Sequence, residues 1–293
     1  MKKLKVHLFT LPRWFAAPYF GGSLLLGAIL AGGLGINAWI GLLVGMLVMA
    51  GGHSFNSFLD YAWTGLDKGE IDERSAEKNY AGGQSLIAQG IVSEREVFFN
   101  AVAWYALAMI PATYLGFNVS WWLPCFVFAG MGVTFWYSAA KFNWTHEVSL
   151  AVGVGPLAVL IGMFSVSNNP PVLAGLLVSP LMGIILCFLG LPLDEYPDAE
   201  ANLKKGVKSV AYKVWEYGVS LEWYVSAWLI MVYVYQVFLI AIGVLNPLTG
   251  LTFIVVPPML MLLVMLQHNF EKVMYALILV SYLYPILLVL GQL

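Results

Sequence analysis

Nine apolar segments make up most of this chain, and they constrain its fold more than any other feature. A helix needs roughly 20 mainly apolar residues to cross the hydrocarbon core of a bilayer. Segments of this kind run over 14–34, 36–58, 96–116, 119–140, 148–166, 172–193, 221–244, 250–268 and 271–291. We therefore expect an all-α integral membrane protein with nine transmembrane helices.

The composition supports this fold class. Hydrophobic residues make up 60% of the 293 residues and charged residues only 10%, against roughly 25% charged residues in soluble domains. So few charges cannot cover a soluble protein of this size, which excludes a soluble enzyme and a nucleic-acid binder. Lys2, Lys3 and Lys5 form a basic start, but segment 14–34 is too long for the core of a signal peptide. We expect it to be a retained first span.

Charge is confined to every second connection between the spans. The charged segments are the N-terminus and residues 59–95, 141–147, 194–220 and 267–272. With nine spans, all 14 lysine and arginine residues then lie on one side, so the positive-inside rule predicts a cytoplasmic N-terminus in a multi-pass protein of the cell membrane. The sequence of residues 207–217 predicts a short amphipathic helix that lies in the interface between membrane and water. We expect a single membrane domain over 1–293, since no soluble domain or linker interrupts the chain.

Carboxylates at the end of the second apolar segment form the first motif. Asn56 and Asp60 are four residues apart and therefore share one face of a helix. Asp67 follows beyond Gly65, where we expect the helix to have ended. The positive-inside rule does not account for these acidic residues, because acidic residues contribute little to orientation.

A second motif lies at the end of the sixth apolar segment. Asp194, Asp198 and Asn202 are again spaced by four residues, and Pro197 is expected to kink or end the helix there. The two motifs lie four spans apart and face the same side of the membrane. Their matching spacing suggests a weak internal duplication.

Two facing clusters of this kind predict a Mg²⁺ site. Carboxylates repel one another unless a cation lies between them, and Mg²⁺ is typically shared between carboxylates and substrate phosphates. The predicted metal ligands are Asp60, Asp67, Asp194, Asp198 and Asn202, with Asn56 beside the diphosphate of a substrate. The alternative is that these residues only cap helix ends at the water interface.

Basic residues accompany the two motifs. Arg74 and Lys78 follow Asp67 in the loop, and Tyr137 and Lys141 end the fourth apolar segment, four residues apart. Cations beside a diphosphate would stabilise the negative charge that moves to the leaving group. The alternatives are a solvated loop for Arg74 and Lys78, and for Lys141 a side chain that snorkels to the headgroups.

The histidines give a weaker signal. His53 lies one turn before Asn56 and could line the same cavity, but a hydrogen-bonded core histidine is the expected role. His7, His146 and His268 are dispersed along the chain, so we expect no histidine metal site.

With both acidic motifs in view, the chain resembles the UbiA superfamily of intramembrane prenyltransferases over nearly its whole length. Residues 194–206 are similar to the family's second motif, and Tyr137 and Lys141 match its Tyr-x3-Lys pattern. Residues 60–67, followed by 91–93, are similar to the branch that prenylates dihydroxynaphthoate in menaquinone synthesis. The resemblance implies a central cavity open to lipid, with Mg²⁺-diphosphate between the two motifs and catalytic roles for Lys141 and Tyr137.

The chain departs from the family pattern at several motif positions. In the first motif, Ser57 follows Asn56 where the family has aspartate, Thr64 fills the third acidic position, and Asp67 comes seven residues after Asp60 where the naphthoate branch usually has six. In the second motif, Asp194 replaces the usual asparagine and Asn202 the usual last aspartate, and the family's Arg-Pro near the first span reads Leu11-Pro12-Arg13 here. These changes keep a supply of oxygen ligands.

The expected function is Mg²⁺-dependent transfer of an isoprenoid chain from a prenyl diphosphate to an aromatic quinone precursor, on the cytoplasmic face. The allylic diphosphate would ionise, and an electron-rich acceptor would attack the carbocation in an apolar cavity. The alternatives are an isoprenoid-lipid transferase with a non-aromatic acceptor, a diphosphatase without an acceptor, and a transporter with an acidic cytoplasmic entrance. A transporter predicts ionisable residues near the middle of the membrane, and the apolar segments contain almost none.

Overall fold

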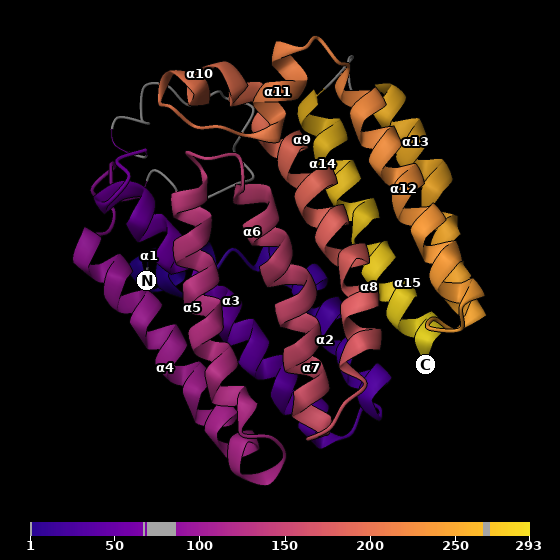
Figure 1. Cartoon of the computed structure of the whole chain (residues 1–293). Coiled ribbons are helices and arrows are strands. Elements are labelled where there is room, and N and C mark those ends of the chain that lie inside the picture. Colours follow the sequence, from indigo (N-terminus) through magenta and orange to yellow (C-terminus); the bar gives the residue numbers. More distant parts are fainter. Residues whose placement is uncertain (1, 67, 69–85, 266–269) are drawn as a thin grey trace.

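The chain folds as a bundle of membrane-length helices in this computed structural model, which describes residues 2–66, 68, 86–265 and 270–293 (Figure 1). Within these ranges no residue lies in a strand. Nine helical stretches of the described chain are long and apolar enough to cross a membrane: Lys3–Ala31, Ile36–Ala62, Glu94–Asn118, Trp122–Ala140, His146–Val166, Val172–Glu195, Leu221–Ala241, Pro247–Met265 and Lys272–Gln292. The predicted fold class is therefore confirmed, although the first span begins well before Trp14.

Several spans are built from more than one helical element. The first contains α1 (Lys2–Lys5), the π-helical η1 (Val6–Thr10), the 3₁₀ turn η2 (Trp14–Ala16) and α2 (Ala17–Ala31). The next three are the single helices α3 (Ile36–Ala62), α4 (Glu94–Asn118) and α5 (Trp122–Ala140). The fifth contains α6 (His146–Val152), η4 (Gly153–Leu157) and α7 (Ala158–Val166), and the sixth contains α8 (Val172–Ile184), η5 (Ile185–Gly190) and α9 (Leu191–Glu195). The last three are α12 (Leu221–Ala241), η7 (Pro247–Val255) with α13 (Val256–Met265), and α14 (Phe270–Ser281) with α15 (Leu283–Gln292).

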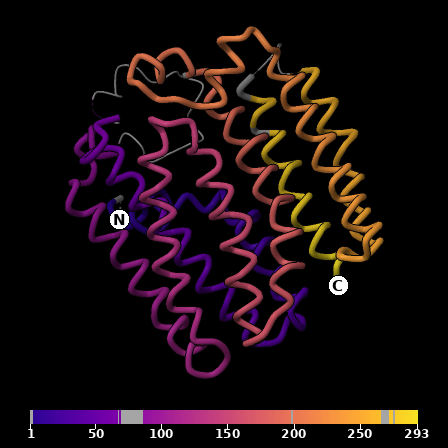
Figure 2. The backbone as a smooth tube through the Cα atoms, viewed as in Figure 1, coloured from indigo at the N-terminus to yellow at the C-terminus, as the bar shows by residue number. Residues whose placement is uncertain are grey.

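The connection after α9 carries three short helices. The 3₁₀ turn η6 (Tyr196–Asp198) contains Pro197, so the predicted break in the helix is confirmed. It leads into α10 (Ala199–Lys204) and α11 (Val210–Glu216), which lie at the upper end of the bundle in Figures 1 and 2. The Ser209 hydroxyl caps α11 by accepting the backbone N–H of Tyr212. The helix predicted over 207–217 is thus present, one turn shorter than expected.

Small residues let the spans approach closely. A side chain at Gly162 of α7 would overlap the backbone carbonyl of Leu24, and one at Gly27 of α2 would overlap that of Val159. Close backbone approach over small residues is the usual way that helices associate in a membrane, where apolar surface alone does not drive association. Gly41 and Gly45 of α3 likewise face Ser165 and Leu24.

The charged segments meet at one end of the bundle. Lys3 Nζ lies 2.8 Å from the Glu96 carboxylate, which joins the N-terminal segment to the start of α4. The backbone N–H of Lys208 donates to the carbonyl of Lys141, joining the connection after α9 to the end of α5. The short turns after α4 and α7 lie at the opposite, lower end in Figure 2. The connections that carry charge in the sequence therefore lie together at one end of the folded bundle.

Candidate functional site

A cavity of about 280 Å³ lies among the helices, and its lining changes from polar to apolar. Its apolar wall comes from the middle of several spans and includes Phe20, Val48, Leu157, Ile161, Met259 and Leu277. Its polar wall lies where the spans meet the charged connections and includes Arg13, Asn56, Tyr137, Lys141, Asp194, Glu195, Asn202 and Lys205. The π-helical turns η4 and η5 contribute Gly153, Ile185 and Gly190. Such turns occur frequently at functional sites.

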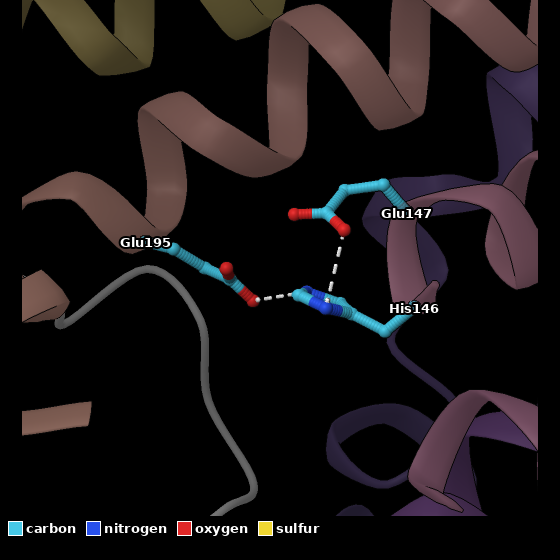
Figure 3. A group of neighbouring side chains, drawn as sticks. All are labelled: His146, Glu147 and Glu195. Carbon is cyan, nitrogen blue, oxygen red and sulfur yellow. Dashed lines mark hydrogen bonds and ion pairs between the residues drawn. The ribbon is translucent and has the colours of Figure 1, made fainter. Parts of the chain in front are cut away.

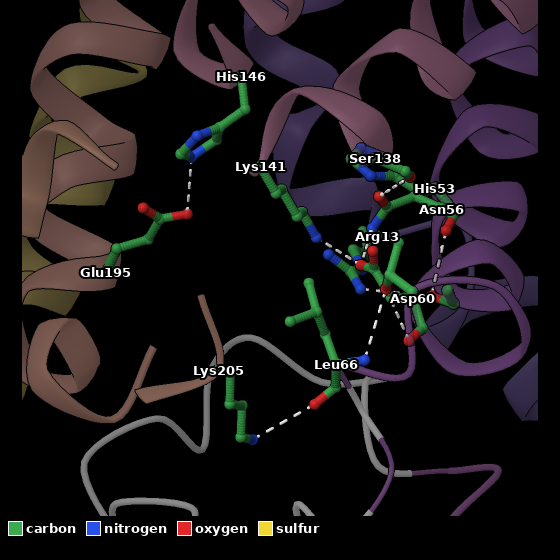
Figure 4. Close-up of polar contacts among 12 residues, drawn as sticks. Arg13, His53, Asn56, Asp60, Leu66, Ser138, Lys141, His146, Glu195 and Lys205 are labelled. Carbon is green, nitrogen blue, oxygen red and sulfur yellow. Dashed lines mark hydrogen bonds and ion pairs between the residues drawn. The ribbon is translucent and has the colours of Figure 1, made fainter. Parts of the chain in front are cut away.

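The first motif is held by a buried ion pair. Lys141 Nζ donates to Asp60 Oδ2 at 2.5 Å, and Asn56 Nδ2 donates to the same oxygen at 2.9 Å (Figure 4). The Asp60 side chain is 1% exposed and that of Lys141 is 12% exposed. Ser138 of α5 donates its hydroxyl hydrogen to Asn56 Oδ1 at 2.9 Å. The predicted residues Asn56, Asp60 and Lys141 thus form one contiguous network between α3 and α5.

Lys141 does not snorkel away from the bundle. Its ammonium points inward to Asp60, and its nitrogen lies 5.1 Å from the centre of the Tyr137 ring. Tyr137 also lines the cavity and packs edge-on against His146, at 5.7 Å between ring centroids. The two residues of the predicted Tyr-x3-Lys pattern therefore both face the cavity.

The structure adds Arg13, which the sequence-based set of site residues did not include. Arg13 Nη2 donates to Ser57 Oγ at 3.3 Å, and its buried Nε has no hydrogen-bond partner in the described chain. Arg13 has a φ of 52°, in the left-handed region that a non-glycine residue rarely adopts. Backbone strain of this kind persists where the surrounding structure imposes it, often at functional sites. A guanidinium group therefore lies on the cavity wall near the first motif (Figure 4).

The role expected for His53 is wrong. His53 lines the cavity, and its buried Nε2 has no hydrogen-bond partner among the described residues. Its ring packs near Phe15, at 6.4 Å between centroids. His53 is thus a polar group on the cavity wall rather than a hydrogen-bonded core histidine.

The second motif reaches the same cavity from the other side of the bundle. Asp194 and Asn202 both line it, and Asp194 Oδ1 is buried with no hydrogen-bond partner in the part of the chain described. Lys205 also lines the cavity and donates to the carbonyl of Leu66, just before the end of the first motif, at 3.3 Å. The Asp198 backbone lies in η6. The two predicted clusters are therefore brought to one cavity, as their shared side of the membrane implies.

Four predicted site residues cannot be placed. Asp67, Arg74 and Lys78 lie outside the described residues, as does the side chain of Asp198. The roles of all the site residues remain predictions.

The described residues fit a Mg²⁺ ion by the chemistry of their oxygens. Asp60 Oδ1 and Asp194 Oδ1 are both buried carboxylate oxygens without hydrogen-bond partners in the described ranges. A buried carboxylate oxygen of this kind is costly unless a cation or a donor satisfies it. Asn202 adds an amide oxygen on the cavity wall. This set matches the all-oxygen ligands that Mg²⁺ prefers.

Comparison with known proteins identifies solved structures of the same fold. No family model matches the chain, and no curated protein matches its sequence. A UbiA homologue from Aeropyrum pernix K1 is similar over 94% of this chain and 95% of that one, with a TM-score of 0.65 at 13% identity. A digeranylgeranylglyceryl phosphate synthase is similar over 100% and 99%, with a TM-score of 0.60 at 14% identity. A UbiA homologue from Archaeoglobus fulgidus bound to DMAPP and Mg²⁺ is similar over 96% and 98%, with a TM-score of 0.57 at 16% identity. The chain therefore has the UbiA-like membrane fold.

The ion pair of Lys141 and Asp60 gives a stability prediction. Lys141→Met leaves the Asp60 carboxylate buried without a countercharge, so we expect the free energy of unfolding to fall by about 3–5 kcal/mol. Adding Asp60→Asn removes the stranded charge, and the double variant should recover most of that loss. Unfolding of the protein in detergent micelles measures both effects.

An exposed ion pair on the same protein provides the control. Lys204 and Glu200 lie 3.0 Å apart with side chains 73% and 61% exposed, so Lys204→Met should cost less than about 1 kcal/mol. Equal losses for Lys204→Met and Lys141→Met would show that the buried pair has no special energetic role.

Proposed function

We propose that this protein is a Mg²⁺-dependent prenyltransferase that moves an isoprenoid chain from a prenyl diphosphate to an aromatic quinone precursor. The observation that carries the proposal is the single cavity that joins carboxylates and cations at one end to an apolar wall at the other. An allylic diphosphate has the same two parts, a charged head and an apolar tail. The UbiA-like fold supports the proposal, since one solved structure of this fold holds DMAPP and Mg²⁺.

The cations of the polar wall would stabilise the leaving diphosphate. As the bond between the first carbon of the prenyl chain and oxygen breaks, its electron pair moves to the diphosphate. Lys141 and Arg13 line the cavity and are fixed before the reaction, Lys141 by Asp60 and Arg13 by Ser57. Fixed positive groups of this kind stabilise developing negative charge without a reorganisation cost. Tyr137 would donate its hydroxyl hydrogen as a weaker, neutral contribution.

The carboxylate residues would hold the metal. Asp60, Asp194 and Asn202 provide oxygens in the described residues, and we propose Asp67 and Asp198 as further ligands. When bound, Mg²⁺ would neutralise diphosphate charge and so favour cleavage of the carbon–oxygen bond. Asn56 would orient Asp60, to which it already donates a hydrogen bond. We propose that Arg74 and Lys78 contact the diphosphate from the loop that follows.

The apolar wall would protect the carbocation. Phe20, Leu157 and Ile161 line this part of the cavity and offer no nucleophile. Phe15, Tyr19 and Tyr282 also line it, and the faces of aromatic rings attract cations. Exclusion of water matters here, because hydrolysis would consume the cation before the acceptor attacks. The acceptor ring carbon would then form the new bond and lose its proton.

A lipid acceptor is the second candidate. The digeranylgeranylglyceryl phosphate synthase shares the fold over 99% of its own length, and its name denotes a glyceryl phosphate product rather than an aromatic one. The aromatic acceptor is favoured by the similarity of residues 60–67 and 91–93 to the dihydroxynaphthoate branch. Product analysis with each acceptor in turn separates the two.

The transfer reaction is tested with purified protein, radiolabelled prenyl diphosphate and a dihydroxynaphthoate acceptor. We expect turnover with Mg²⁺ and none in EDTA, with recovery when Mg²⁺ is restored. Asp194→Ala should abolish turnover because it removes a metal ligand, while Lys141→Gln should lower the single-turnover rate by about 10²–10³-fold. Tyr137→Phe should have a smaller effect, since a neutral donor stabilises an anion less than a cation does.

Glu200→Gln is the matched control for this assay. Glu200 is an exposed carboxylate on α10, close in sequence to the second motif and absent from the cavity wall. It should keep full activity. Full activity of wild type in EDTA, or of Asp194→Ala, would remove the proposed mechanism.

We also propose that the charged end of the bundle faces the cytoplasm, in the cell membrane, with the chain as a single membrane domain whose cavity opens to lipid. Single cysteines at Asn168, in the exposed connection after α7, and at Leu248, exposed in the first turn of η7, should then react with an impermeant reagent from outside the cell. A cysteine at Lys204 should react only after permeabilisation. The native Cys125 is exposed and is replaced by serine first. Labelling of position 204 from outside would contradict this orientation.

A further inference from the structure

A second cluster of ionisable side chains lies beside the second motif. His146 and Glu147 begin α6, and Glu195 ends α9 (Figure 3). His146 is 0% exposed, Glu147 1% and the Glu195 side chain 12%. Glu195 lines the cavity, so the cluster can be reached from it. The proposed transfer of a prenyl group does not use these three residues.

The three side chains lie next to one another, and each carboxylate faces a different nitrogen of the His146 ring (Figure 3). His146 Nε2 lies 3.1 Å from Glu195 Oε1, and His146 Nδ1 lies 3.3 Å from Glu147 Oε2. One ligand atom from each residue can be chosen so that all three lie within 4.8 Å of one another. In a tetrahedral zinc site with bonds near 2.0–2.1 Å, neighbouring ligand atoms are about 3.4 Å apart. Because an imidazole binds a metal ion through one of its two nitrogens, a side-chain rotation would have to bring both carboxylates to the same nitrogen of His146.

Two buried polar atoms in the cluster also lack a conventional partner. His146 Nδ1 and Glu147 Oε2 form no hydrogen bond within the described residues, although they face each other. The other oxygen, Glu147 Oε1, accepts the backbone N–H of Val210 at 2.5 Å. Buried polar atoms are costly when they form no hydrogen bond, so this nitrogen and this oxygen favour a ligand that would satisfy both.

The charge balance favours a divalent cation. His146 and Glu147 are almost fully buried, and carboxylates beside an imidazole are costly to ionise in such a place unless a cation compensates their charge. A divalent ion bound by all three side chains would supply that charge.

We infer that His146, Glu147 and Glu195 form a second metal site, which binds a divalent transition-metal ion of the Zn²⁺ type. The imidazole selects this class of ion, because Zn²⁺ accepts mixed nitrogen and carboxylate ligands whereas Mg²⁺ favours oxygen alone. The site is separate from the proposed Mg²⁺ ligands. It joins the start of α6 to the end of α9 and, through Glu147 and Val210, to α11. The bound ion would thus fix the segment that carries Asp194.

The experiment uses the full-length protein in detergent, with Mg²⁺ present throughout. After chelation and dialysis, the protein is titrated with Zn²⁺ or with Co²⁺, whose visible absorption reports nitrogen and oxygen coordination. We expect about one Zn²⁺ per chain that excess Mg²⁺ does not displace. His146→Gln should weaken Zn²⁺ binding by at least the roughly 10–100-fold that outer-sphere changes cost.

Two variants separate this site from the rest of the protein. His7→Gln removes a histidine of η1 outside the cluster and should leave Zn²⁺ affinity unchanged. Asp60→Ala should lose prenyl transfer but keep the Co²⁺ spectrum, so failure of the proposed function and failure of this site are distinguishable. Glu195→Gln replaces His146→Gln if the latter does not fold. Wild-type protein that binds no Zn²⁺, or equal affinity in wild type and His146→Gln, would overturn the inference.

Discussion

The buried ion pair between Lys141 and Asp60 is the interaction on which the polar end of the cavity depends. It fixes the end of α5 against α3, and it places Asn56 and Tyr137 on the same wall. Buried ion pairs add little net stability, because desolvation offsets most of the attraction between the charges. The pair therefore contributes more by placing a carboxylate and a cation together at the cavity than by raising the free energy of unfolding.

The packing of the surrounding helices forms the cavity in which this ion pair lies. Glycines at 27 and 162 let α2 and α7 approach at backbone distance, and residues of both helices, among them Phe20 and Ile161, line the cavity. The π-helical turns η4 and η5 lie on that cavity. The helices α3, α5 and α9 end at the charged connections, so their polar ends meet at the cavity while their middle sections remain apolar. A molecule with a charged head and an apolar tail matches a cavity whose wall is polar at one end and apolar at the other.

The sequence predicted the spans and the local faces, because both depend on neighbouring residues. Length and hydropathy define each span, and the spacing of Asn56 and Asp60 defines one helix face. The sequence did not predict contacts between residues that are far apart in the chain. Asp60 and Lys141 are 81 residues apart, and nothing in either motif indicates that they pair. Arg13 reaches the cavity through a left-handed turn that its neighbours do not signal. The expectation of no histidine metal site considered only histidines, whereas His146 meets Glu195, 49 residues away.

The most direct test of the account is a structure of the protein with Mn²⁺ and a non-cleavable prenyl thiolodiphosphate. Mn²⁺ replaces Mg²⁺ at oxygen ligands and is located by its anomalous scattering. The account predicts Mn²⁺ and the diphosphate between Asp60 and Asp194, with the prenyl chain against Leu157 and Ile161. A diphosphate bound away from both aspartates, or a prenyl chain outside the cavity, would contradict it.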